Sequence, residues 1–224
     1  MTTTDENNTN LIITFEPCCK SDDLLENSLL PEYRVGIIGQ KLGGRQSRTR
    51  PYLRVPSVGT LVITFIGAFV SIALLSIISQ YGSQENASLD NAPFIIGSFG
   101  ATAVLLFAAP KSPLAQPRNL IGGHTISALV GVGFQTAFED SPDLQWLAAA
   151  LAVSVSIFAM QITGTLHPPG GATALIAVIG PESIKDLSLL YVLIPVLSGA
   201  MLMMVVALLS NNLVRFQRYP DTWW

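Results

Sequence analysis

Charged residues are scarce in this chain, and their scarcity excludes most classes of soluble protein. Lysine and arginine contribute 12 residues and aspartate and glutamate 15, so only 12% of the 224 residues are charged. Soluble globular proteins carry about 25% charged residues, which cover their surfaces. More than half of these charges lie in residues 1–54. The charges in residues 55–224 are too few for a water-soluble fold, a nucleic-acid-binding surface or a disordered chain. The sequence therefore predicts an integral membrane protein.

The sequence has only two cysteines and none of the common catalytic patterns. The two cysteines, Cys18 and Cys19, are adjacent, so they predict neither a disulfide framework nor a metal site. The apolar runs contain no aspartate, glutamate or cysteine, and the sequence has no HExxH, GxSxG, Walker or dinucleotide-binding pattern. We therefore expect a protein that is not an enzyme and that binds no cofactor or metal.

The N-terminal region divides into an acidic part and a basic part. Residues 1–33 are polar and acidic, without the apolar core of a cleavable signal peptide. Residues 34–54 carry six lysines and arginines and no acid. A basic stretch beside a membrane segment binds anionic lipid headgroups and fixes orientation. We expect a cytoplasmic tail over residues 1–54, a transmembrane domain over 55–213 and a short cytoplasmic C-terminus over 214–224.

Six runs without charge follow Pro56, which predicts an all-α membrane bundle of six segments. A helix needs about 20 predominantly apolar residues to cross the hydrocarbon core. Four runs are that long: 57–80, 119–138, 144–166 and 187–209. Two runs are shorter and are interrupted by glycine and proline: 92–109 and 168–180.

The distribution of basic residues favours six crossings. If all six runs cross and the N-terminus is inside, Lys185 is the only one of the 12 basic residues on the outside. This is the asymmetry of the positive-inside rule. A re-entrant 168–180 segment would move Arg215 and Arg218 to the outside, which fits less well. The sequence thus predicts both termini in the cytoplasm, for a protein of the plasma membrane or the bacterial inner membrane.

The two short runs resemble each other. Residues 99–110 read FGATAVLLFAAP and residues 170–181 read GGATALIAVIGP. Each copy is the middle member of a set of three segments. Because three crossings are an odd number, the second set starts on the opposite side of the membrane, so the two sets must be inverted relative to one another. Inverted repeats with paired short, broken helices are typical of a transporter whose binding site lies near the bilayer midplane.

The first turns of these short helices form the predicted binding site. A helix that begins inside the bilayer presents free N–H groups and a positive dipole end, both of which suit an anion. Inversion would bring the two N-termini together. The alternative is that the glycines only allow close helix packing. The predicted substrate-binding residues here are Gly100, Ala101, Thr102, Gly170, Gly171, Ala172 and Thr173.

Two histidines, His124 and His167, are the only side chains in the membrane runs that can become charged near neutral pH. Intramembrane ionisable residues are rare and usually functional. Each histidine also lies near a segment end, where it can simply reach interfacial water. We include both in the predicted site, because a protonated imidazole would attract an anion and would allow proton coupling.

Residues 164–174 carry a resemblance to a known family. They read Gly-Thr-Leu-His-Pro-Pro-Gly-Gly-Ala-Thr-Ala and resemble the signature of the HPP family of integral membrane proteins, named for its His-Pro-Pro sequence. Residues 97–107 and 113–124 are similar to the other strong block of that family. The resemblance covers about residues 55–210. It implies nitrite transport, to which similar members in chloroplasts and cyanobacteria have been linked.

These observations favour a transmembrane carrier or channel for a small monovalent anion, nitrite first. One alternative is a channel for a small neutral solute, since two facing positive helix ends would also exclude protons. Another is a membrane scaffold subunit that transports nothing. The expected partners are a small inorganic anion, the lipid bilayer and anionic headgroups at residues 34–54, with no nucleic acid. Homo-oligomerisation is left open.

Overall fold

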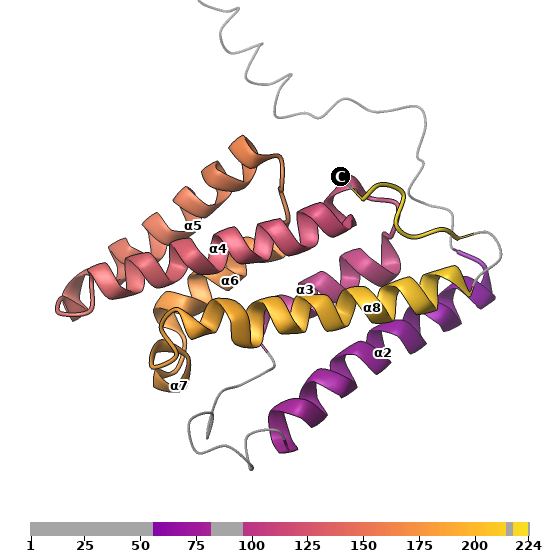
Figure 1. Ribbon diagram of the computed structural model, residues 1–224, viewed down its shortest axis with the longest axis horizontal. Coiled ribbons are helices and arrows are strands. Elements are labelled where there is room, and N and C mark those ends of the chain that lie inside the picture. Colours follow the sequence, from indigo (N-terminus) through magenta and orange to yellow (C-terminus); the bar gives the residue numbers. More distant parts are fainter. Residues whose placement is uncertain (1–55, 82–95, 214–216, 224) are drawn as a thin grey trace, which may run out of the picture. The chain divides into compact units, whose positions relative to one another are not determined.

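The computed structural model describes residues 56–81, 96–213 and 217–223, and all regular structure in these ranges is helical (Figure 1). The N-terminal tail and its basic stretch lie outside the described residues. The longer elements are α2 (Val58–Tyr81), α3 (Ser98–Ala103) with its continuation η5 (Val104–Ala108), α4 (Pro117–Ala137), α5 (Gln145–Thr163), α6 (Pro168–Ile179), and η8 (Val192–Leu197) with its continuation α8 (Ser198–Asn212). The shorter ones are η6 (Pro113–Ala115), η7 (Pro142–Leu144) and α7 (Glu182–Lys185).

Each of the six predicted runs contains a helix, which confirms the all-helical membrane bundle. Within the described ranges, three helical stretches are long and apolar enough to cross a membrane: Val58–Tyr81, Pro142–Thr163 and Val192–Asn212. The α3–η5 stretch and α6 are shorter, as the sequence predicts. The arrangement as six crossings in two inverted repeats stays a prediction.

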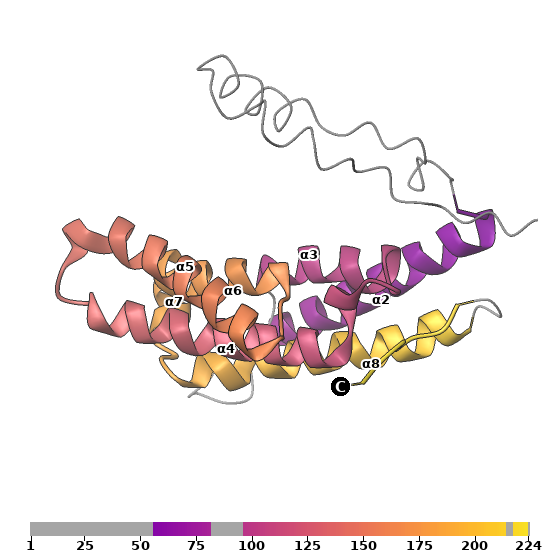
Figure 2. The same cartoon turned by 90° about the horizontal axis from the view of Figure 1, so that it is seen from above.

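Helix α4 is the centre of the bundle. It packs against both α5 and α6 and also contacts η8 and α8. Helix α8 packs along α2, and the short α3–η5 stretch fits between this pair and α6. Figure 2 shows α4 and α8 on one side and α5, α6 and α3 on the other. The least apolar of the long helices thus packs against α5, α6, η8 and α8, which suits its glycines and its histidine.

Large apolar side chains on the outside mark the surface that faces lipid. Helix α2 exposes Phe65 at 70% and Phe69 at 63%, and α5 exposes Phe158 at 63%. In water this apolar surface would favour association, whereas in a bilayer it lies against hydrocarbon tails. The interior is also apolar, with Phe99 and Tyr191 fully enclosed.

A left-handed glycine separates α5 from α6. Gly164 follows the last residue of α5 with φ 64°, a conformation that glycine adopts without strain. The N–H of Thr165 then donates to the carbonyl of Met160 at 2.9 Å and closes the helix end. Pro168 starts α6 at a position where its missing N–H costs nothing. This short connection places His167 directly before α6, facing the interior.

Glycines on α4 allow the close approach of α6, and one pair of variants tests this directly. A Cβ at Gly131 would lie 2.7 Å from the carbonyl oxygen of Ala174, whereas a Cβ at Gly133 would meet nothing within 4 Å. We expect Gly131→Ala to destabilise the protein by about 1–3 kcal/mol, because backbone atoms of α6 must move. Gly133→Ala is expected to leave stability unchanged or slightly higher. Thermal unfolding in detergent measures both, and equal midpoints would contradict the packing.

Candidate functional site

Five polar side chains from α3, α4 and the start of α6 meet inside the bundle. They are Ser98 and Thr102 on α3, His124 on α4, His167 immediately before α6, and Thr173 on α6; each is at most 1% exposed. We call them the histidine–threonine cluster. Polar groups inside a membrane protein are costly unless they are paired and are often functional. The cluster is therefore the candidate site.

Hydrogen bonds join the five side chains into one chain. Thr173 Oγ1 lies 2.9 Å from Ser98 Oγ and 2.8 Å from His124 Nδ1. His124 Nε2 lies 2.9 Å from Thr102 Oγ1, and Thr102 Oγ1 lies 3.3 Å from His167 Nε2. Thr102 is thus within hydrogen-bonding distance of both rings, and His124 bridges the threonines of both short helices.

The carbonyl of Leu114 determines the tautomer of His167. His167 Nδ1 lies 2.8 Å from this oxygen, which can only accept, so Nδ1 carries a hydrogen and donates it. In the neutral ring, Nε2 then has a lone pair toward the Thr102 hydroxyl. His124 faces a hydroxyl at each nitrogen, and because hydroxyls donate or accept, both of its neutral tautomers fit.

The surroundings of the two rings are aromatic and uncharged. The ring centroids of His124 and His167 are 4.8 Å apart, and Phe99 meets His124 edge-on at 5.6 Å. Of the residues that the structure describes, no lysine, arginine, aspartate or glutamate is buried. The same residues contain no group of three or more histidines, cysteines or acids that could hold a metal. With both imidazoles neutral, the cluster carries no net charge.

The predicted glycines and alanines lie apart from these side chains. Gly100 and Ala101 are exposed, and a Cβ at Gly100 would meet nothing within 4 Å. Gly171 and Ala172 are half-buried. Gly170 is buried, and a Cβ there would lie 2.7 Å from Ser127 Oγ, so this glycine serves helix packing.

The first-turn N–H groups are partly used by the helices themselves. Gly170 N–H donates to the His167 carbonyl at 2.8 Å, and Gly100 N–H donates to the Gly97 carbonyl at 3.2 Å. Pro168 and Pro169 have no N–H. The structure therefore unites the predicted histidines and threonines, and it leaves side chains rather than backbone amides as the main donors there.

Comparisons with known proteins identify the family of the chain. The family model for the transmembrane region of HPP proteins matches residues 53–220. The chain belongs to the HPP family. Two relatives from Dictyostelium discoideum, each described as a transmembrane protein, are similar to this HPP-family chain. One is 44% identical over 192 residues, which are 86% of this chain and 65% of that protein. The other is 42% identical over 161 residues, which are 72% of this chain and 50% of that protein.

The matched regions leave part of each relative unaccounted for. This HPP-family chain spans between half and two thirds of the length of these two proteins. No solved structure matches the chain.

Three contacts of the cluster were not predicted from sequence. Ser98 stands four residues before Thr102, so the helical period puts both on one face, and this spacing could have indicated it. Leu114 contributes its backbone carbonyl, for which sequence offers no signal. The hydroxyl of Tyr191 donates to the Thr173 carbonyl at 3.0 Å, across a distance in sequence that only the fold closes.

The C-terminal residues of the HPP-family chain hold the loop that carries Leu114. The Tyr219 hydroxyl donates to the Ala115 carbonyl at 2.8 Å, and burial raises the pKa of this phenol. Gln116 Oε1 accepts from the N–H of Asp221 at 2.9 Å, while its Nε2 donates to the Ser112 carbonyl at 2.9 Å. This network fixes the position of the Leu114 carbonyl next to His167.

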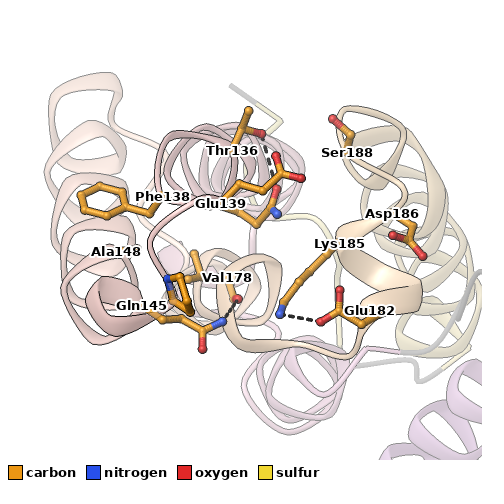
Figure 3. A pocket seen from close by; sticks show the side chains of 12 residues that line it. Thr136, Phe138, Glu139, Gln145, Ala148, Val178, Glu182, Lys185, Asp186 and Ser188 are labelled. Carbon is orange, nitrogen blue, oxygen red and sulfur yellow. Dashed lines mark hydrogen bonds and ion pairs between the residues drawn. The ribbon is translucent and has the colours of Figure 1, made fainter.

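A pocket of about 620 Å³ opens elsewhere, beside the C-terminal end of α6 (Figure 3). Glu139, Glu182 and Asp186 line it together with Lys185, which pairs with Glu182 at 2.9 Å. Acids outnumber bases in this wall, so the pocket repels anions and is not the predicted anion site. Val178 at the pocket and His167 before α6 stand at opposite ends of that helix.

Proposed function

We propose that this HPP-family protein is a transmembrane carrier or channel for a small monovalent anion, nitrite first, and that the anion is bound at the histidine–threonine cluster. The observation that carries the proposal is the meeting of two duplicated threonines, Thr102 and Thr173, at His124 inside an apolar bundle. No chemical reaction is assigned to the chain.

The donors of the cluster suit a small anion. When its internal hydrogen bonds open, two threonine hydroxyls and the ring N–H of His124 become available to an oxyanion. An anion held by few, exchangeable donors can also leave again, which transport requires. Unpartnered lysines or arginines would instead hold the anion tightly.

The contacts between the two short helices support an inverted repeat. Ser98 at the start of α3 meets Thr173 in the second turn of α6, while Thr102 meets His167 just before α6. Sequence numbers thus rise along one helix as they fall along the other, so the helices run antiparallel where they touch. Six crossings with both termini in the cytoplasm, in the plasma membrane or a bacterial inner membrane, complete the proposal.

Flux into vesicles tests the function. Purified protein in sealed proteoliposomes is expected to admit nitrite at least about tenfold faster than protein-free vesicles, with slower uptake of nitrate, formate and chloride. Uptake of urea but of no anion would favour the neutral-solute channel. Equal rates with and without protein for all five solutes would contradict transport and favour a scaffold, in which the glycines of α4 and α6 only pack helices.

A further inference from the structure

A bound anion would meet no positive charge in the histidine–threonine cluster unless one of the histidines is protonated. The buried polar residues in the described ranges include no lysine or arginine. Arg118, one turn and a half before His124, is exposed and donates from Nη2 to the Thr163 carbonyl at 2.7 Å. An anion among neutral groups in an apolar interior is strongly disfavoured. A protonated imidazole would supply the missing positive charge.

The two imidazole rings can hold one extra proton between them, but not two. Their centroids are 4.8 Å apart, and two positive charges this close repel each other strongly in a medium of low dielectric constant. Thr102 Oγ1 lies 2.9 Å from Nε2 of His124 and 3.3 Å from Nε2 of His167. The pair therefore offers a single positive charge, which matches a single monovalent anion.

We propose that this protein moves one proton together with each anion, and that His124 and His167 hold the proton and exchange it through the Thr102 hydroxyl. The inference rests on the proposed anion transport and adds its coupling to protons. It makes the transported pair electrically neutral as a whole.

The exchange between the rings balances. A protonated His124 gives its Nε2 hydrogen to Thr102 Oγ1, while the original hydroxyl hydrogen of Thr102 moves to His167 Nε2. His124 becomes neutral and its Nδ1–H still donates to Thr173 Oγ1. His167 becomes positively charged and its Nδ1–H still donates to the Leu114 carbonyl. Thr102 ends with the same number of hydrogens as before.

The neighbouring elements contribute no other proton carrier to this exchange. Tyr191, immediately before η8, donates its hydroxyl to the Thr173 carbonyl at 3.0 Å, and Tyr219 donates to the Ala115 carbonyl at 2.8 Å. Both are backbone carbonyl bonds and neither involves an imidazole ring. Helices α3, α5, α6 and α8 contain no titratable side chain. Among the described residues, the two histidines alone carry the proton.

The coupling is measured on the full chain in sealed proteoliposomes that contain a pH-sensitive dye and whose membrane potential is clamped with potassium and valinomycin. An inward nitrite gradient is expected to acidify the lumen by one proton per anion, after subtraction of protein-free vesicles. The uptake rate is expected to change by less than about twofold when the clamped potential is reversed, because the field acts only on net charge.

Variants locate the proton. His167→Asn retains a donor for the Leu114 carbonyl but cannot be protonated, and it is expected to lower proton uptake per anion at least about tenfold. The control Ser156→Ala removes a buried hydroxyl that donates to the Val153 carbonyl of its own helix, and it is expected to keep the wild-type ratio.

Two results overturn the inference. Anion uptake without acidification, at a rate that follows the clamped potential, overturns the coupling and leaves the proposed transport standing. A wild-type proton ratio in His167→Asn overturns the role of the histidine pair. Wild-type vesicles that take up no anion at all contradict the proposed function itself.

Discussion

Replacing His124 by glutamine is expected to lower anion flux roughly 100-fold while the bundle stays folded. This ring contacts a threonine on each short helix, at 2.9 Å for Thr102 and 2.8 Å for Thr173. A positive charge about 4 Å from an anion contributes on the order of 4 kcal/mol at an effective dielectric constant of about 20. His167, with its ring centroid 4.8 Å away, retains part of that attraction, so we expect a loss of about 2.7 kcal/mol, or about 100-fold.

The effect of His124→Gln on stability is expected to be much smaller. Hydrogen bonds between helices inside membrane proteins contribute about 0.6 kcal/mol each on average. The Thr102 hydroxyl still has an acceptor in the Ser98 carbonyl, 3.1 Å away, and Thr173 keeps its bond to Ser98 Oγ at 2.9 Å. The expected loss is therefore on the order of 1 kcal/mol. This separation of flux from stability identifies a site residue.

Flux in proteoliposomes and thermal unfolding in detergent measure the two effects on the same preparation. Ser127→Ala serves as the control, because Ser127 is a fully buried α4 residue whose hydroxyl, among the described residues, hydrogen-bonds only to the Met160 sulfur, at 3.6 Å. It is expected to transport within about twofold of wild type, since a hydroxyl–sulfur contact is weak. A His124→Gln protein that transports like this control would show that the ring only supports the fold.

Much of the site was accessible to sequence reasoning because its chemistry is rare in membrane segments. His124 and His167 were the only side chains in the apolar runs that can become charged near neutral pH, and the repeated Gly-Ala-Thr-Ala singled out Thr102 and Thr173. The structure brings all four together. Rarity and duplication together indicated the interior, although neither identifies which atoms bond.

The orientation of the small residues could not be predicted in the same way. Successive residues of a helix point about 100° apart, so a four-residue repeat contains residues on several faces. Gly100 and Ala101 are exposed, whereas Thr102 directly follows them and is fully buried. Only the packing of α3 between α6 and α8 decides which of these neighbours faces the cluster.

Partners far away in sequence were also beyond prediction. The Leu114 carbonyl and the Gln116 side chain act through the loop before α4, which the C-terminal residues hold in place. Backbone acceptors leave no compositional signal, and glutamines in such a chain are more often helix contacts than loop anchors. The predicted 168–180 run begins at Pro168, as α6 does, whereas the runs 119–138 and 144–166 missed that Pro117 starts α4 and that Gly164 ends α5.

Removing the Thr102 hydroxyl is expected to break the hydrogen-bonded connection between the two imidazole rings and to lower anion flux about 10- to 100-fold. Thr102→Val has nearly the same shape and, of the residues that the structure describes, deletes the only side-chain oxygen within hydrogen-bonding distance of both Nε2 atoms, at 2.9 and 3.3 Å. A hydrogen bond to a charged group contributes about 1.5–3 kcal/mol, which sets this range. Flux at matched expression measures the effect.

Thr125→Val is the matched control for Thr102→Val, because it also replaces a threonine hydroxyl by a methyl group. Thr125 directly follows His124 on α4. Thr125 Oγ1 is buried and has no hydrogen-bond partner among the described residues. Its removal is therefore expected to leave flux within about twofold and to keep or slightly raise stability, since an unsatisfied buried hydroxyl disappears. Combining Thr102→Val with His124→Gln is expected to cost much less than the sum of the two, because both changes break one chain of hydrogen bonds. Additive losses would mean that Thr102 and His124 act independently, and the cluster would then not be a single site.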